Sequence, residues 1–395
     1  MVKLNPSFSR LNTEYIFSII DRKLLELKKK LPSAELINFS IGDIALPIAP
    51  SIIKAITQAM EEMGTPEGIK GYGPSIGYDF LRQAIAEKEF NHLGISWEEI
   101  FISDGTNSDA VNILDLFSPQ TSIGIPNPTY PAYLNSTLLT GRKKILSFPC
   151  LPENDFAPLP PQDPCDVIYL CSPNNPTGMA MTTAQLQSWI DYARKHRSLL
   201  LIDSAYIAFI TSPNVPRSIY ELPGAHECAI EMRTFSKSAG FTGLRCAYMV
   251  IPKHLTAALN RKKLPLHEFW SKRQGIKFNG VAYPIQKAAE AALSPEGERE
   301  TKSQVQLYIQ VAKRLKRGLQ QMGHTCWGGE DAPYIWWKTP HNLTSWDFFD
   351  QLLNRCQIIC VPGKGFGSCG EGYVRLSAFS SLQQADLALT KIKQL

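Results

Sequence analysis

Short, nearly continuous apolar runs recur between residues 100 and 251 of the chain. Runs of about 4–8 apolar residues, bounded by turn residues, are typical of strands that are buried on both faces. The strands expected on this basis are Ile100–Ser103, Ser122–Ile125, Asp166–Cys171, Leu199–Asp203, Ala229–Phe235 and Ala247–Ile251. Helical spacing separates several of them, as in Thr183–Lys195. This alternation predicts an α/β protein with a mostly parallel sheet that helices cover on both faces.

The two ends of the chain follow a different pattern. Apolar residues at helical spacing predict a helix from about Thr13 to Lys30 that ends before Pro32, and Glu35–Phe39 resembles a short strand. After Pro295–Gly297, helices and strands mix. The elements expected there are a helix at Ser303–Met322, a strand at Tyr334–Lys338, a helix at Ser345–Asn354 and a strand at Glu371–Ala378. We therefore expect a large domain over residues 46–290 and a small α+β domain over residues 291–395. Residues 1–45 should pack with the small domain or across a dimer.

Length and charge narrow the class of protein. A chain of 395 residues with 44% hydrophobic content can bury a large core, and it exceeds the length at which a single core usually stops growing. The formal net charge is +5, with short basic runs at Lys28–Lys30 and Arg261–Lys263. We interpret both runs as solvated helix faces and expect no nucleic-acid partner.

The apolar runs and the cysteines indicate where the protein is located and whether it binds a metal. The N-terminal stretch MVKLNPSFSRLNTEY lacks the apolar region of a signal peptide, and the apolar runs are too short to span a bilayer. The nine cysteines include no CxxC pair. We therefore expect reduced thiols in a cytoplasmic protein, with neither a membrane partner nor a metal site.

Polar residues stand where the expected strands end, and open α/β sheets bind ligands at the carboxyl ends of their strands. Asp203 closes one strand, and Tyr206 follows three residues later. Ser236 and Lys237 follow the next strand, with Arg245 eight residues further on. Taken singly, each has a structural interpretation, because a strand-end Asp is more often a turn or cap residue. Their joint occurrence favours a ligand site.

Two turns follow other strands of the expected sheet. Asn174–Gly178, with the sequence NNPTG, comes after the strand that ends at Cys171. Gly105-Thr106-Asn107 comes after Ile100–Ser103 and opens a helical pattern. Backbone N–H groups at such a turn are suited to holding a phosphate.

The order NNPTG, Asp-x-x-Tyr, Ser-Lys and Gly-x-Arg resembles that of the fold type I aminotransferases, which use pyridoxal 5′-phosphate. Longer segments resemble the LL-diaminopimelate aminotransferase family over nearly the whole chain. These segments are residues 39–47, 71–82, 218–252, 274–300 and 370–379. NNPTG is shared by many aminotransferases, whereas FSKSAGFTGLRCAY and KFNGVAYPIQ are more specific. The resemblance implies a large domain with a seven-stranded sheet, a smaller α+β domain, and a homodimer with shared active sites.

The resemblance also assigns three catalytic residues, Lys237, Asp203 and Tyr206. Lys237 would carry the cofactor as a Schiff base and act as general base once the substrate amine replaces it. Asp203 would face the pyridine nitrogen and keep it protonated, so that the ring accepts electrons. Tyr206 and Asn175 would donate hydrogen bonds to the phenolate oxygen of the ring.

Further contacts are implied in the same way. Tyr130 would stack on the ring, and Arg245 would hold the phosphate through a charge-assisted contact. The cofactor-binding residues implied are Tyr72, Gly105, Thr106, Asn107, Tyr130, Asn175, Asp203, Tyr206, Ser236, Lys237, Arg245 and Asn279, with Tyr72 and Asn279 from the partner subunit. The substrate-binding residues implied are Tyr15, Gly42, Asn107, Tyr130, Asn175, Asn279 and Arg375. Arg375 would grip the substrate α-carboxylate with both prongs of its guanidinium, although a strand Arg can also be a surface residue.

Two positions depart from the family pattern. Asn107 stands where the family has Lys, and Ser75 stands where it commonly has Glu. In the family both positions lie near the distal end of the substrate, which bears an ammonium and a carboxylate. We therefore expect broader substrate tolerance than in relatives that keep both charges.

The activity implied is reversible transamination, which converts LL-2,6-diaminopimelate and 2-oxoglutarate to tetrahydrodipicolinate and glutamate in lysine and peptidoglycan precursor synthesis. Within the same machinery, an aromatic, alanine or aspartate-type aminotransferase, or a C–S lyase, is an alternative. A lyase would release pyruvate and ammonia without a keto-acid acceptor. A non-catalytic cofactor-binding protein is a third alternative, and the intact set of Lys237, Asp203, Tyr206 and Arg245 argues against it.

Overall fold

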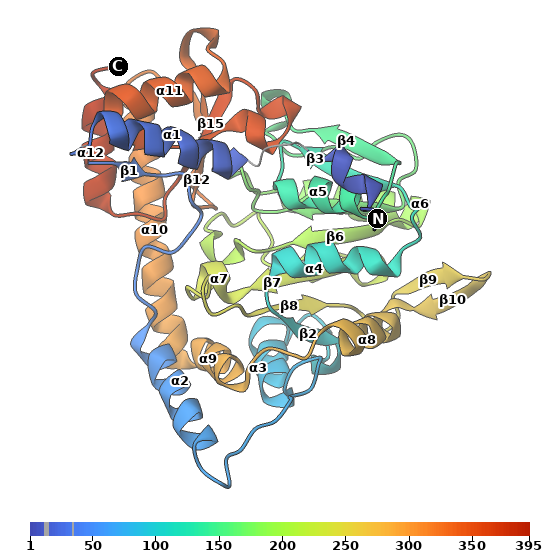
Figure 1. Cartoon of the computed structure of the whole chain (residues 1–395). Helices are drawn as coiled ribbons and strands as arrows, with labels where there is room; N and C mark the ends of the chain where they lie inside the picture. The colour runs from blue at the N-terminus through green and yellow to red at the C-terminus, as the bar shows by residue number, and fades with distance from the viewer. Residues whose placement is uncertain (12–15, 34) are drawn as a thin grey trace.

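A seven-stranded sheet forms the centre of the molecule in the computed structural model, which describes residues 1–11, 16–33 and 35–395 (Figure 1). The strand order is β2-β8-β7-β6-β5-β3-β4. Strand β8 runs antiparallel to both of its neighbours, and the other pairs are parallel. The strands are β2 (Ile100–Ser103), β3 (Ile123–Asn127), β4 (Ile145–Pro149), β5 (Val167–Cys171), β6 (Leu199–Asp203), β7 (Ala229–Thr234) and β8 (Ala247–Val250). The prediction of a mostly parallel sheet is confirmed.

Helices cover both faces of this sheet, which explains why its strands are apolar at every position. Leu200 and Ile202 of β6 pack with helices α2, α3, α6 and α9, whereas Leu199 and Leu201 pack with α4, α5 and α8. These helices are α2 (Pro50–Met63), α3 (Asp79–Glu89), α4 (Thr106–Asn112), α5 (Pro131–Leu139), α6 (Thr183–His196), α8 (Leu266–Lys277) and α9 (Tyr283–Leu293). Each buried Leu or Ile side chain contributes roughly 1.5–3 kcal/mol, so both faces stabilise the sheet.

A second, smaller sheet has the order β11-β12-β15-β14 and is antiparallel throughout. Ile16 and Ile20 of the N-terminal helix pack into the core of this part, together with three C-terminal helices. A two-stranded parallel pair, β1 with β13, joins the N-terminal segment to the same part. The elements are α1 (Ile16–Lys30), β1 (Ile37–Asn38), α10 (Pro295–Gln321), β11 (Cys326–Gly328), β12 (Tyr334–Lys338), α11 (Ser345–Cys356), β13 (Ile358–Ile359), β14 (Val361–Pro362), β15 (Tyr373–Ser377) and α12 (Leu382–Ile392). The domain boundaries at residues 45 and 290 stay a prediction.

Helix α10 begins eight residues earlier than the sequence predicts, at Pro295 instead of Ser303. The Ser294 hydroxyl accepts a 3.1 Å hydrogen bond from the backbone N–H of Gly297, which caps the helix. Proline suits the first helical turn because its missing N–H is not needed there. A methyl group at Gly297 would lie 2.1 Å from the carbonyl oxygen of Ala291. The Pro-Glu-Gly sequence is therefore the start of this helix, and the predicted start at Ser303 is wrong.

Smaller differences occur elsewhere. The predicted start of the first helix, at Thr13, lies outside the described residues, and the strand predicted at residues 35–39 is reduced to β1. Phe235 begins the short helix α7 (Phe235–Ser238) instead of ending β7. The basic run at residues 261–263 is exposed on a hairpin of β9 (Thr256–Leu259) and β10 (Lys262–Pro265), so its interpretation as a helix face is wrong.

Within residues 1–11, 16–33 and 35–395, no helix is both long and apolar enough to cross a membrane. In the same ranges, no three His, Cys, Asp or Glu side chains gather in a way that could hold a metal ion.

Candidate functional site

A cavity of about 350 Å³ lies where strands β5, β6 and β7 end, between the seven-stranded sheet and β12 and β15 of the smaller sheet. Figure 1 shows these strand ends facing the small sheet. Parallel strands bring residues that are far apart in the sequence to one edge, which is why the predicted set converges. The predicted residues that line the cavity are Gly42, Gly105, Thr106, Asn107, Tyr130, Asn175, Asp203, Tyr206, Ser236, Lys237, Arg245 and Arg375.

Asp203, the last residue of β6, is buried at the floor of the cavity. The Tyr133 hydroxyl donates a 2.6 Å hydrogen bond to its Oδ2, and the backbone N–H of Ala205 donates a 3.1 Å hydrogen bond to its Oδ1. Burial raises the pKa of Asp203, while the hydrogen bonds and the charge of Lys237 oppose that rise. The carboxylate is therefore held in one orientation from both oxygens and can face a buried cation.

Lys237 extends into the cavity from helix α7, and its Nζ donates a hydrogen bond to the carbonyl oxygen of Gly42. Burial lowers the pKa of Lys237 to about 8; the carboxylates of Asp43 and Asp203 oppose this lowering, and the charges of Arg375 and Arg245 add to it. A lysine with this pKa is about one-tenth neutral at pH 7, so it can act as a nucleophile or base.

One end of the cavity is built to hold an anion. Gly105 has φ +149°, and a methyl group there would lie 2.3 Å from Nη2 of Arg245. Only glycine therefore leaves room for the guanidinium beside this turn. Ser236 is buried next to it, and its hydroxyl accepts a 2.9 Å hydrogen bond from that of Thr234. The Asn107 side chain also lines this region, and its Oδ1 accepts a 3.2 Å hydrogen bond from the Tyr130 hydroxyl.

Arg375 approaches from strand β15, and its side chain is only 3% exposed, so the alternative of a surface arginine is wrong. Its Nη1 donates a 2.7 Å hydrogen bond to Oδ1 of Asn175, and its Nη2 donates to the carbonyl oxygen of Ser40. The guanidinium carbon lies 4.5 Å from the centre of the Tyr334 ring. Its buried Nε has no hydrogen-bond partner in the described part of the chain. A buried guanidinium with unused donors is suited to a carboxylate ligand.

Three residues discussed at the sequence level do not line this cavity. Tyr72 is 92% exposed, and Asn279 is also exposed. Ser75 does not line the cavity either. Tyr15 lies outside the described residues. The assignment of Tyr72 and Asn279 to a partner subunit stays a prediction.

Sequence reasoning missed several residues that the fold brings to the site. Tyr133 could have been found, because it lies one helical turn after Tyr130 on the same helix. Asp43 directly follows Gly42 and could have been included with it. Thr234 and Tyr334 carried no such signal, since each reads as an ordinary strand residue.

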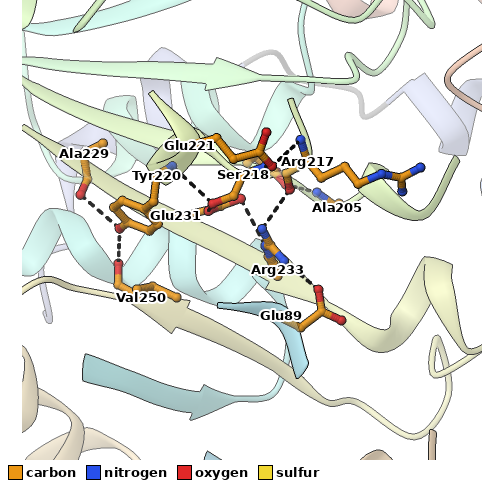
Figure 2. Close-up of polar contacts among 11 residues, drawn as sticks. Glu89, Ala205, Arg217, Ser218, Tyr220, Glu221, Ala229, Glu231, Arg233 and Val250 are labelled. Carbon is orange, nitrogen blue, oxygen red and sulfur yellow. Dashed lines mark hydrogen bonds and ion pairs between the residues drawn. The ribbon is translucent and has the colours of Figure 1, made fainter. Parts of the chain in front are cut away.

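A buried charge cluster surrounds Glu231 and Arg233 of strand β7 (Figure 2). Arg233 Nε donates to Glu231 at 3.0 Å, and its Nη1 donates to Glu89 at 2.8 Å. Its Nη2 donates to the carbonyl oxygen of Arg217 at 2.8 Å, and the Ser218 hydroxyl donates to Glu231 at 2.7 Å. Buried charges are tolerated when they are paired in this way. The cluster fixes the strand just before the turn that carries the lysine of the site.

Comparisons with known proteins agree with this geometry. Residues 34–392 match the family model described as aminotransferase class I and II. The LL-diaminopimelate aminotransferase of Lachnospira eligens is 44% identical over 408 aligned positions, which cover 100% of both chains. The solved structure of L,L-diaminopimelate aminotransferase from Chlamydomonas reinhardtii has a TM-score of 0.94 and 38% identity, over 100% of this chain and 98% of the other. A variant of Thermus thermophilus aspartate aminotransferase shares the fold, with a TM-score of 0.85 and 20% identity over 100% of each chain.

Proposed function

This chain belongs to the class I and II aminotransferases, and we propose that it interconverts LL-2,6-diaminopimelate and 2-oxoglutarate with tetrahydrodipicolinate and glutamate. The observation that carries the proposal is full-length similarity to two proteins named for that substrate. The convergence of Lys237, Asp203 and Arg375 on one cavity supports it. In the biosynthetic direction the product is a precursor of lysine and peptidoglycan.

The anion end of the cavity suits the phosphate of pyridoxal 5′-phosphate. Arg245, Ser236 and the turn at Gly105–Asn107 supply cationic, hydroxyl and backbone donors there. Because residue 105 is glycine, the Arg245 guanidinium can lie directly against this turn, where a side chain would clash with it. When bound, this cofactor supplies an electron sink for the charge that develops at the substrate Cα.

The other residues of the cavity suit the ring of that cofactor. Asp203 offers a carboxylate to a protonated ring nitrogen, and Tyr130 offers an aromatic face. Asn175 uses Oδ1 to accept from Arg375, which leaves its Nδ2 donors for a ring oxygen beside the Tyr206 hydroxyl. The ring nitrogen, the ring face and the ring oxygen of the cofactor would therefore each face a side chain of suitable chemistry.

Lys237 moves the proton at the substrate Cα. Because burial lowers its pKa to about 8, the amine accepts a proton readily near neutral pH and returns it readily. Its hydrogen bond to the Gly42 carbonyl keeps Nζ on the cavity side. Arg375 holds the α-carboxylate, which directs the Cα–H bond of an amino acid toward that amine.

We also propose a cytoplasmic homodimer in which Tyr72 and Asn279 complete the partner's site. The exposure of both residues near segments that resemble the family supports the dimer. All nine cysteines are free, and all but Cys369 are buried, which supports a reducing compartment.

A coupled assay with LL-diaminopimelate and 2-oxoglutarate tests the function directly. The holoenzyme should form glutamate, lose this activity in Lys237→Ala, and keep it in Lys253→Ala, whose lysine is exposed and paired with Glu98. Transfer from aromatic amino acids, alanine or aspartate, without turnover of LL-diaminopimelate, would reject the assigned substrate. Release of pyruvate and ammonia without a keto acid would indicate a C–S lyase instead.

A further inference from the structure

Tyr334 contacts three parts of the site that have separate roles. It begins strand β12 and is only 1% exposed. Its hydroxyl oxygen lies 2.8 Å from that of Tyr206, and the guanidinium carbon of Arg375 lies 4.5 Å from its ring centre. A methyl group at Gly42, whose carbonyl accepts from Lys237, would lie 2.3 Å from the Tyr334 hydroxyl. One side chain of the small sheet thus touches the ring, carboxylate and amine regions together.

The surroundings of Tyr334 leave it little freedom. Its backbone pairs with Ser377 in the small sheet. Methyl groups at Gly178 and Gly328 would lie 2.2 and 2.4 Å from its carbonyl oxygen, so backbone from the large part and from the small sheet packs tightly against it. Its ring meets that of Tyr206 edge to face, with 5.2 Å between centres. A residue held this firmly can fix the position of the groups that it contacts.

We propose that Tyr334 is a positioning residue. It orients the Tyr206 hydroxyl toward the ring oxygen of the cofactor, and it fixes the Tyr206 side chain relative to Arg375, which binds the substrate carboxylate. This inference rests on the proposed function. Tyr334 donates its proton to the Tyr206 oxygen, and the O–H of Tyr206 is then free to donate to the cofactor. A hydroxyl that accepts a hydrogen bond becomes a stronger donor, so the bond from Tyr334 strengthens the hydrogen bond that Tyr206 donates to the cofactor.

The two hydroxyl oxygens are placed so that either can donate, and the proposed direction is the one that leaves the O–H of Tyr206 for the cofactor. Burial raises the pKa of both Tyr206 and Tyr334, so both hydroxyls keep their protons at neutral pH. Arg375 faces Tyr334 from strand β15, while Cys171 and Asp203 face it from β5 and β6. Arg375 lies over the ring of Tyr334, so it does not compete for the hydroxyl.

The test measures the pH midpoint at which the visible absorbance of the bound cofactor changes. Hydrogen bonds to the ring oxygen of the cofactor lower this midpoint. Tyr334→Phe keeps the ring and removes the hydroxyl, and we expect the midpoint to rise by about half a pH unit. Tyr206→Phe should raise it further. Because Tyr334 acts through Tyr206, the double variant should have the midpoint of Tyr206→Phe alone. Tyr308→Phe is the matched control: it lies in the same aromatic cluster and its hydroxyl bonds the backbone of Ala45, so its midpoint should not move.

The proposal is overturned if Tyr334→Phe leaves the midpoint unchanged while Tyr206→Phe raises it. Full additivity in the double variant would also overturn it, because Tyr334 would then act by another route. If one single variant no longer binds the cofactor, the midpoint of the other variant is compared with that of wild type. The affinity for a dicarboxylate inhibitor is compared in the same way, and unchanged values overturn the proposal. Failure of the proposed function would show itself differently, as a wild-type holoenzyme without activity on LL-diaminopimelate.

Discussion

The hydroxyl of Tyr133 lies 2.6 Å from Oδ2 of Asp203 and donates its proton to that carboxylate. Tyr133 is itself buried and stacks on Tyr169, with 4.7 Å between the ring centres. Burial raises the pKa of Asp203, and the hydrogen bond from Tyr133 acts in the opposite direction. The tyrosine therefore favours the charged form of the carboxylate that should face the cofactor.

Tyr133→Phe should lower kcat/KM by about tenfold to a hundredfold, since a hydrogen bond to a charged group contributes roughly 1.5–3 kcal/mol. Steady-state kinetics with LL-diaminopimelate and 2-oxoglutarate measures this. Tyr169→Phe is the control: its hydroxyl donates to the Ala110 carbonyl at 2.6 Å, and its ring packs on Tyr133 without a hydrogen bond to Asp203. Equal losses in both variants would mean that packing, and not the hydrogen bond to the carboxylate, is responsible.

Lys237 should destabilise the cofactor-free protein at neutral pH. Burial lowers its folded-state pKa from 10.5 to about 8, so the unfolded chain binds the proton more tightly. The cost is fully present below about pH 8 and is relieved as the pH rises toward about 10.5. A shift of this size corresponds to about 3 kcal/mol. Urea unfolding of the apoprotein should therefore find Lys237→Met more stable than wild type near pH 7, with most of that advantage lost near pH 10. An advantage that does not change with pH would contradict the buried, charged lysine.

Arg375→Lys should raise KM for the amino donor and for 2-oxoglutarate together, by about a hundredfold, because one guanidinium grips the carboxylate of both. A lysine cannot reproduce the fork that bonds Asn175 and the Ser40 carbonyl at the same time. Initial-rate kinetics with each substrate varied in turn measures both constants. Arg314→Lys, in an exposed pair with Asp386, should leave them unchanged. A rise for only one substrate would show that the two carboxylates bind in different places.

The sequence predicted the part of the site that depends on strand ends. Asp203 ends an apolar strand, Asn175 and Lys237 come shortly after the ends of two others, and parallel pairing brings such positions to one edge. Tyr334 was not predictable, because its hydroxyl meets Tyr206 across 128 residues and its local sequence reads only as a buried strand. Tyr72 could be assigned only through the family, because its proposed role needs a second chain.

The boundaries of the helices and strands were also only partly predictable from the local sequence. Strand β6 agrees with its predicted bounds, because an apolar run that ends in a polar residue has one interpretation. The start of α10 was mispredicted because Pro295 and Gly297 are both helix-breaking in general and helix-compatible in the first turn. Only the cap from Ser294 and the close packing around Gly297 decide between the two.

The remaining prediction concerns substrate breadth. Asn107 lines the cavity as a neutral, exposed side chain bonded to Tyr130, where the related family has Lys. Ser75 likewise replaces a carboxylate. Without a charge at either position, the distal ammonium and carboxylate of the substrate lose the partners that would separate LL from meso stereochemistry. We expect kcat/KM for meso-diaminopimelate within about tenfold of that for the LL isomer, with measurable transfer from lysine.

Restoring the charges should narrow that breadth. Asn107→Lys with Ser75→Glu should lower the rate with meso-diaminopimelate and lysine more than the rate with the LL isomer, because each charge then penalises a misplaced distal group. The double variant leaves the net charge of the protein unchanged, because Asn107→Lys adds one positive charge and Ser75→Glu adds one negative charge, so a loss of breadth reports the position of the charges. Strong rejection of the meso isomer by the wild-type enzyme would show that selectivity comes from the shape of the cavity and from the partner subunit, and that the two neutral residues do not relax it.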